Sequence, residues 1–105
     1  NDELLKLGLL KRSDIKNQAA EEPACRKYYM HGLGHSLGLD VHDYGWTQEP
    51  FEEGWVITVE PGIYIPEEGF GVRLENNIVI RKGDAEDLFK DIPIEAEEIE
   101  DLMNA

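Results

Sequence analysis

Apolar and β-branched residues concentrate in the second half of the chain and predict its strands. The run 55–60 alternates along its length, so that Val56, Thr58 and Glu60 share one face of a strand. Pro61 ends this run because it lacks the N–H group that a sheet requires. Beyond it, the pattern predicts extended structure over 63–65, a turn over 66–69, the longest strand over 71–81, a turn over 82–84 and a short strand over 85–89.

Helical spacing of apolar residues is confined to the two ends of the chain. Leucines predict a helix over 2–10, and Ser13 is placed to cap a second helix over 14–20. At the other end, a helix over 94–103 gives Ile99 and Leu102 a common face. The segments between are predicted to be a linker over 21–24, a strand over 27–30, a glycine-containing segment over 31–38 that is not a helix, and a loop over 43–54.

The charge of the chain limits its partners. With 10 basic and 23 acidic residues, its formal net charge is -13. Nucleic acid and anionic membrane surfaces would repel it, so neither is expected as a partner. A length of 105 residues allows one domain with one core.

The single cysteine and the ends of the chain bear on location and completeness. Cys25 has no second cysteine to bond, which suits a reducing compartment, and we expect a cytoplasmic protein. The sequence shows no signal peptide and no apolar run of membrane-spanning length. Because the chain begins with Asn1, on a predicted helix, we expect it to be a fragment of a longer protein.

The candidate chemistry lies between residues 31 and 77. All three histidines fall between His31 and His42, and two carboxylates, Glu60 and Glu75, follow in apolar, β-favouring runs. Burying a charge in such a run is costly unless it is paired or bound to metal. Imidazole with carboxylates suits Mn, Zn or Co better than Ca or Mg. By themselves, Arg73 and Glu75 would be an ordinary surface ion pair. The combination of the three histidines with the two glutamates, however, predicts a metal-dependent hydrolase.

Three segments form a combined signature: residues 30–43 (MHGLGHSLGLDVHD), 54–65 (GWVITVEPGIYI) and 71–80 (GVRLENNIVI). Together they resemble the pita-bread metallopeptidases, the family of methionine aminopeptidase, prolidase and aminopeptidase P, with the aminopeptidase P branch most similar. The resemblance implies an α+β fold, namely the C-terminal half of a pita-bread domain, with a curved, mainly antiparallel sheet and helices on its outer face. Residues 1–26 would then be a helical lead-in from a truncated domain, and 27–105 the C-terminal part of the catalytic domain.

The resemblance also implies a metal centre. His35, Glu60 and Glu75 match metal ligands, and Glu75 is expected to bridge two divalent ions, which we expect to be Mn, with Co and Zn as alternatives. Two such ions would activate a water molecule and polarise the scissile carbonyl. Glu60 would orient that water and accept its proton.

Three further residues match positions near the substrate. His31 would stabilise the tetrahedral intermediate or shuttle protons, His42 would contact the substrate around its proline, and Arg73 would steady the carboxylates. The implied activity of the parent protein is removal of the N-terminal residue from peptides with proline in second position. Prolidase, a non-catalytic pita-bread binding module and a metal-free amidinohydrolase such as creatinase are the alternatives.

The sequence departs from the family pattern before the histidines. The family uses two additional aspartate ligands upstream, whereas only Asp2 and Asp14 precede His31 here, and neither lies in an apolar strand pattern. The resemblance therefore implies an incomplete site and an inactive fragment. We expect the parent protein to be a homo-oligomer, and the fragment to expose apolar sheet and self-associate.

Overall fold

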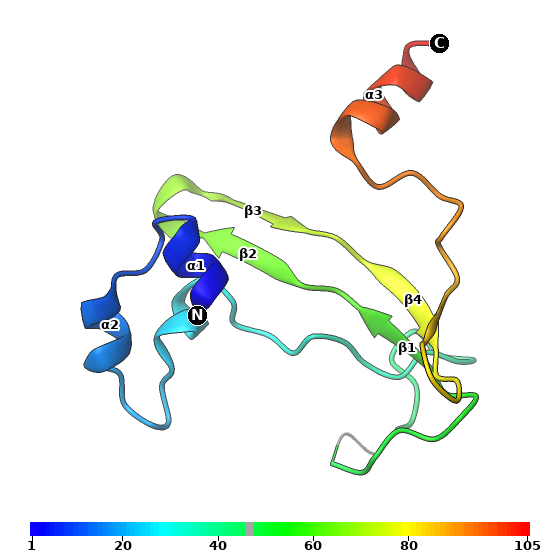
Figure 1. The fold of residues 1–105 in the computed structure, drawn as a ribbon, viewed down its shortest axis with the longest axis horizontal. Helices are drawn as coiled ribbons and strands as arrows, with labels where there is room; N and C mark the ends of the chain where they lie inside the picture. The colour runs from blue at the N-terminus through cyan, green and yellow to red at the C-terminus, as the bar shows by residue number, and fades with distance from the viewer. Residues whose placement is uncertain (46–47) are drawn as a thin grey trace. The chain divides into compact units, whose positions relative to one another are not determined.

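The computed structural model describes residues 1–45 and 48–105. The chain forms two compact units, one containing 1–32 and 62–73 and the other 33–61 and 74–105. No helix in the described ranges is long and apolar enough to cross a membrane. In chain order the elements are α1 (Asp2–Lys6), α2 (Arg12–Lys16), η1 (Ala24–Lys27), β1 (Val56–Val59), β2 (Gly62–Ile65), η2 (Pro66–Glu68), β3 (Phe70–Arg73), β4 (Asn76–Val79), β5 (Glu86–Asp87) and α3 (Ala96–Met103), where η denotes a 3₁₀ helix (Figure 1).

The first unit packs its N-terminal helical segment against a β-hairpin. Strands β2 and β3 pair antiparallel, and the turn between them closes at Gly69, whose φ of 70° is a conformation that glycine adopts without strain. Buried Leu4, Leu10 and Tyr28 form a small core against this hairpin, which lies beside α1 in Figure 1. Burial of these few apolar side chains therefore contributes to the stability of this unit.

The second unit is built on an antiparallel sheet in the order β1-β4-β5. Within it, Thr58 of β1 lies opposite Asn77 of β4. The irregular segment 33–37, which precedes β1 in the chain, runs alongside it. Backbone hydrogen bonds join the two, including Thr58 N–H to the His35 carbonyl at 2.9 Å and Glu60 N–H to the Leu33 carbonyl at 2.7 Å. The segment that carries His35 is thereby fixed to the strand that leads to Glu60.

The predicted helices are present with different bounds. The helix predicted over 2–10 ends at Lys6, and Gly8 then takes a φ of 73° that a helix does not allow. The helix predicted over 14–20 lies at Arg12–Lys16, so Ser13 is inside it; the Asp14 carboxylate instead accepts the backbone N–H of Lys11 at 2.7 Å. At the C-terminus, α3 begins at Ala96, two residues later than predicted.

Two strand predictions are wrong. Residues 27–30 contain no strand, although the Tyr28 carbonyl accepts a backbone N–H from Tyr64 at 2.9 Å. The strand predicted over 71–81 is divided into β3 and β4, because Leu74 and Glu75 leave the extended ladder. The strand before Glu60, the turns and the short last strand are confirmed.

The remaining segment predictions concern loops and domain limits. No helix forms over 31–38, as predicted. The loop predicted over 43–54 is confirmed where it is described, and its residues 46–47 lie outside the described ranges. The predicted domain boundary between residues 26 and 27 stays a prediction, while the compact units divide the chain differently because 62–73 return to the N-terminal unit.

Candidate metal centre

Glu60 and Glu75 are brought together by the pairing of β1 with β4. Val59, the last residue of β1, lies opposite Asn76, the first residue of β4. Glu60 follows Val59 and Glu75 precedes Asn76 in the chain. The two glutamates therefore occupy the positions next to this pair if the antiparallel register is continued. The interruption of the predicted long strand therefore falls at a candidate ligand.

His35 completes a compact group with these glutamates. One ligand atom from each of His35, Glu60 and Glu75 can be chosen so that all lie within 4.8 Å of one another. His35 Nε2 is 3.2 Å from Glu60 Oε1, and the two side chains are 24% and 13% exposed. An imidazole and two carboxylates are a donor set that Mn, Zn and Co accept.

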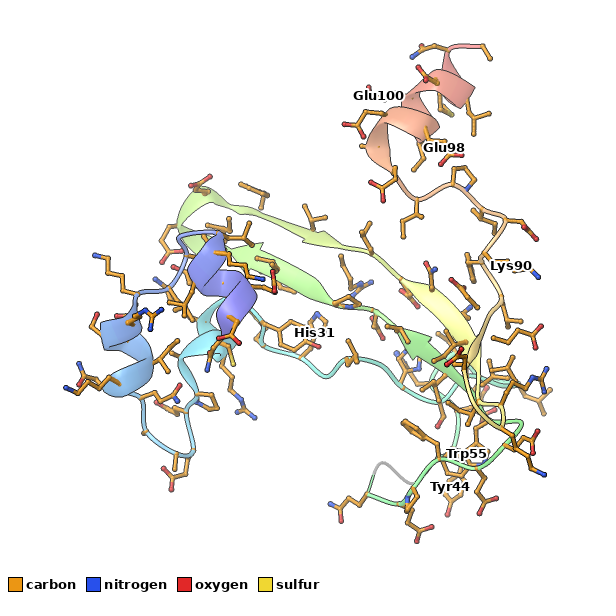
Figure 2. The ribbon with its side chains drawn as sticks, in the orientation of Figure 1. His31, Tyr44, Trp55, Lys90, Glu98 and Glu100 are labelled. Carbon is orange, nitrogen blue, oxygen red and sulfur yellow. The ribbon has the colours of Figure 1, made fainter. Side chains whose placement is uncertain are left out.

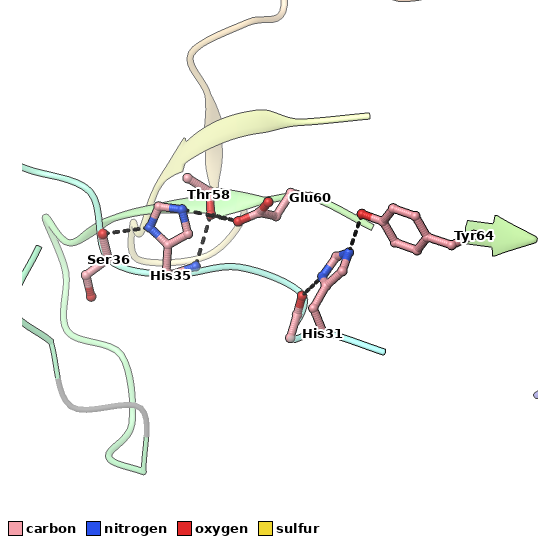
Figure 3. A network of polar contacts seen from close by, with 7 residues as sticks. His31, His35, Ser36, Thr58, Glu60 and Tyr64 are labelled. Atoms are coloured by element: carbon pink, nitrogen blue, oxygen red, sulfur yellow. Dashed lines mark hydrogen bonds and ion pairs between the residues drawn. The ribbon is translucent and has the colours of Figure 1, made fainter. Parts of the chain in front are cut away.

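The hydrogen bonds of His35 strengthen the case for a cation. Its Nδ1 lies 2.9 Å from the Ser36 carbonyl (Figure 3), and a carbonyl can only accept, so the proton must be on Nδ1. In the neutral ring, Nε2 is then an acceptor facing the acceptor Glu60 Oε1. Two acceptors at this distance repel unless a proton or a metal ion lies between them. The residues present thus fit a divalent metal ion.

His42 lies next to this group on a loop held by Asp43. The His42 and His35 ring centroids are 4.3 Å apart in an edge-on arrangement. Asp43 Oδ1 accepts the backbone N–H of Tyr44 at 2.7 Å, and Oδ2 accepts that of Asp40 at 3.4 Å. These two hydrogen bonds, of which the one from Tyr44 has the larger effect, hold the pKa of the Asp43 carboxyl below its ordinary value.

His31 and Arg73 belong to the first unit. His31 Nδ1 is 2.7 Å from the Gly32 carbonyl, so Nε2 accepts the hydroxyl hydrogen bond of Tyr64 at 2.8 Å (Figure 3). A Cβ on Gly62 would come within 3.0 Å of both side chains, which explains the glycine. Arg73 is the last residue of β3 and lies opposite Gly62.

Tyr64 and Thr58 contact the predicted site residues, and the sequence reasoning assigned a role to neither. Tyr64 shares a strand face with Gly62, and Thr58 shares one with Glu60, so strand alternation was the available signal. Thr58 is only 2% exposed, and its hydroxyl is bonded to both His35 and Glu60. A tyrosine or threonine in a strand usually packs without a further role, so alternation alone does not separate these two from their neighbours.

An apolar cavity of about 220 Å³ lies within the second unit beside His35. Trp55, which immediately precedes β1 and is labelled in Figure 2, contributes to its wall with Phe51, and the two ring centroids are 6.1 Å apart. Apolar walls lower the local dielectric and strengthen charge interactions at the adjacent imidazole.

The sequence matches the model of metallopeptidase family M24 over residues 6–82. This chain belongs to metallopeptidase family M24.

Curated relatives agree with this membership. The chain is 46% identical to the Xaa-Pro aminopeptidase of Haemophilus influenzae over 113 aligned positions, covering 96% of the chain and 26% of the relative. It is 39% identical to the Xaa-Pro dipeptidase of Pyrococcus furiosus, covering 72% of the chain and 23% of that protein. The chain thus spans about a quarter of the length of the relatives it matches.

Solved structures match over nearly the whole chain. A putative aminopeptidase P from Bacillus anthracis superposes with a TM-score of 0.79 at 42% identity, covering 98% of this chain and 23% of that one. Zn-substituted Escherichia coli aminopeptidase P in complex with product gives 0.80 at 43% identity, covering 98% and 26%. The predicted α+β pita-bread fold is confirmed.

Proposed function

We propose that this chain is part of a longer protein, called here the parent protein, that is a metal-dependent Xaa-Pro aminopeptidase. The observation that carries the proposal is the placement of His35 Nε2 against Glu60 Oε1, with Glu75 in the same group. The similarity to Xaa-Pro aminopeptidases supports the substrate class, which is peptides with proline in second position.

His35, Glu60 and Glu75 are the residues that would hold the metal. A divalent ion bound there supplies Lewis-acid chemistry, lowering the pKa of water and polarising a carbonyl. In this proposal the Glu60 carboxylate has two roles. It would bind the metal, and it would accept the proton lost by the attacking water. We propose Mn as the native metal and expect two aspartate ligands outside this chain.

Three other side chains would act on the peptide. His31, whose Nδ1–H is already committed to a backbone carbonyl, presents Nε2 and the Tyr64 hydroxyl as a pair able to move a proton. His42 would contact the substrate near its proline, and Arg73 would steady the carboxylates. These roles stay proposals that rest on the family resemblance.

Prolidase is the second candidate, favoured by the similarity to an Xaa-Pro dipeptidase. Both activities use the same kind of ligand group, and they differ in the length of peptide accepted. Substrate length therefore separates them where the ligand group does not.

The test uses the parent protein with Mn, an Xaa-Pro-Yaa tripeptide and an Xaa-Pro dipeptide. Glu75→Gln keeps the shape of the side chain and removes its charge, and cleavage should fall by at least about 100-fold because a metal ligand is lost. Glu98→Gln on α3, labelled in Figure 2, is the matched control and should cleave at the wild-type rate.

Cleavage of the tripeptide that is lost in Glu75→Gln and kept in Glu98→Gln would support the aminopeptidase. Cleavage of the dipeptide alone would support prolidase. Cleavage of neither, with Mn, Co and Zn each tried, would contradict both and favour a binding module.

We further propose that the parent protein is a cytoplasmic homo-oligomer. The location rests on the lone cysteine and is tested by cell fractionation. The assembly is tested by light scattering of the purified parent, where a monomer mass would contradict it.

A further inference from the structure

The hydroxyl of Thr58 joins two residues of the candidate metal centre. Its Oγ1 accepts the backbone N–H of His35 at 3.0 Å and donates to Glu60 Oε1 at 3.1 Å, as Figure 3 shows. The residue is 2% exposed, so water does not compete for these bonds. One buried side chain therefore connects the main chain at one candidate ligand with the carboxylate of another.

The surrounding backbone holds this threonine in place. Thr58 N–H donates to the His35 carbonyl at 2.9 Å, so His35 is bonded to both the backbone and the side chain of the same residue. Gly34 permits this approach, because a Cβ there would be 1.8 Å from the Thr58 carbonyl oxygen. The Thr58 hydroxyl oxygen accepts the backbone N–H of His35 in place of a backbone carbonyl, and the hydroxyl proton is donated to Glu60.

We infer that Thr58 is a positioning residue of the metal centre. Its hydroxyl fixes the orientation of the Glu60 carboxylate relative to His35. This inference rests on the proposed metal-dependent function. The bond engages Oε1, the same oxygen that lies 3.2 Å from His35 Nε2. A carboxylate whose orientation is set before metal binding loses less entropy when it binds, and hydrogen-bonded partners of ligands typically govern about 10–100-fold of metal affinity.

The test compares three variants of the parent protein. Thr58→Val keeps the β-branched shape and removes the hydroxyl, whereas Thr58→Ser keeps the hydroxyl and removes the methyl group. Val79→Ala, which shortens a buried side chain of the same sheet, controls for loss of packing. Thr58→Ala replaces the valine variant if that protein does not fold.

Two readouts are independent of peptide cleavage. The first is the Mn dissociation constant, obtained by titration with detection of free Mn, and the second is the absorption spectrum of the Co-loaded protein. Thr58→Val should weaken Mn binding by about 10–100-fold and alter the Co spectrum. Thr58→Ser should restore both to near wild-type values, and Val79→Ala should lower the melting temperature of the metal-free protein without changing either.

Wild-type Mn affinity and an unchanged Co spectrum in Thr58→Val would overturn the inference, as would an equal loss of affinity in Val79→Ala. A wild-type parent that binds Mn but cleaves no Xaa-Pro peptide would contradict the proposed activity, and the variants would still decide the role of Thr58. A wild-type parent that binds no metal would overturn both proposals.

Discussion

At the scale of single residues, Gly34 shows how closely the histidine segment approaches β1. A Cβ at this position would overlap the carbonyl group of Thr58, with 1.8 Å to the oxygen and 2.8 Å to the carbon. Backbone atoms cannot move aside as a flexible side chain can. The requirement for glycine here comes from this contact and not from a positive φ.

Gly34→Ala should therefore destabilise the protein by about 1–3 kcal/mol, the usual cost of an overpacked site. Urea unfolding of the parent protein, followed by circular dichroism, measures this loss. An unchanged midpoint would contradict the close approach of residues 34 and 58.

Asp43 makes the loop that carries His42 sensitive to acid. The backbone N–H groups of Tyr44 and Asp40 lower the pKa of its carboxyl in the folded protein. The folded state therefore binds this proton less readily than the unfolded state. The stabilisation is complete above the ordinary pKa of aspartate, about 3.9, and is lost as the pH falls through the lower folded value.

Asp43→Asn should remove this contribution, so wild-type and variant should differ most above about pH 4 and converge below it. Thermal unfolding of both proteins between about pH 3 and pH 7 measures the difference. A difference that stays constant over this range would show that the carboxyl is not held by these bonds.

At the scale of elements, the division of the predicted long strand follows from a break in the neighbouring strand. β4 pairs with β1, β3 pairs with β2, and Pro61 lies between β1 and β2. Proline has no N–H to donate, so the ladder cannot run through it. The partner strand is interrupted at Leu74 and Glu75, whose backbone is thereby released from regular pairing.

The first unit depends on a small core at α1. Leu4 is 5% exposed and packs in the core, whereas Leu7, one turn later, is 62% exposed. Leu4→Ala should cost about 2–5 kcal/mol of unfolding free energy because it removes buried methyl groups and leaves a cavity. Leu7→Ala is the matched control and should change stability little; equal effects of the two variants would contradict this packing.

At the scale of the whole molecule, few of the side chains that the structure describes are buried. Among the described residues, the buried hydrophobic ones are Leu4, Leu10, Tyr28 and Val79. Large apolar side chains such as Leu39, Leu102 and Met103 are more than half exposed. Apolar surface of this kind favours association over a dispersed monomer.

Residues 1–105 expressed alone should therefore self-associate, and with Mn they should not cleave Xaa-Pro peptides, because the family resemblance implies two ligands outside them. Sedimentation velocity over a range of concentrations and a peptide assay measure these properties. A monodisperse monomer with a high melting temperature, or robust turnover, would contradict the respective prediction.

The sequence predicted the strands and turns well where local chemistry decides them. Proline and glycine mark the break after Glu60 and the turn at Gly69, and alternation placed the β1 strand correctly. The bounds of the helices were less predictable. Neither α1 nor α2 exceeds five residues, and so short a helix ends where tertiary contacts and local caps allow.

By itself, the sequence determined which groups are available, namely three imidazoles and two carboxylates in strand-forming surroundings, because side-chain chemistry and local backbone preference are properties of the residues themselves. Only the tertiary structure decided which of them meet. His35 lies 23 residues from Thr58, and His31 lies 33 residues from Tyr64. Contacts over such separations depend on register and on the path of the chain, which no local pattern specifies.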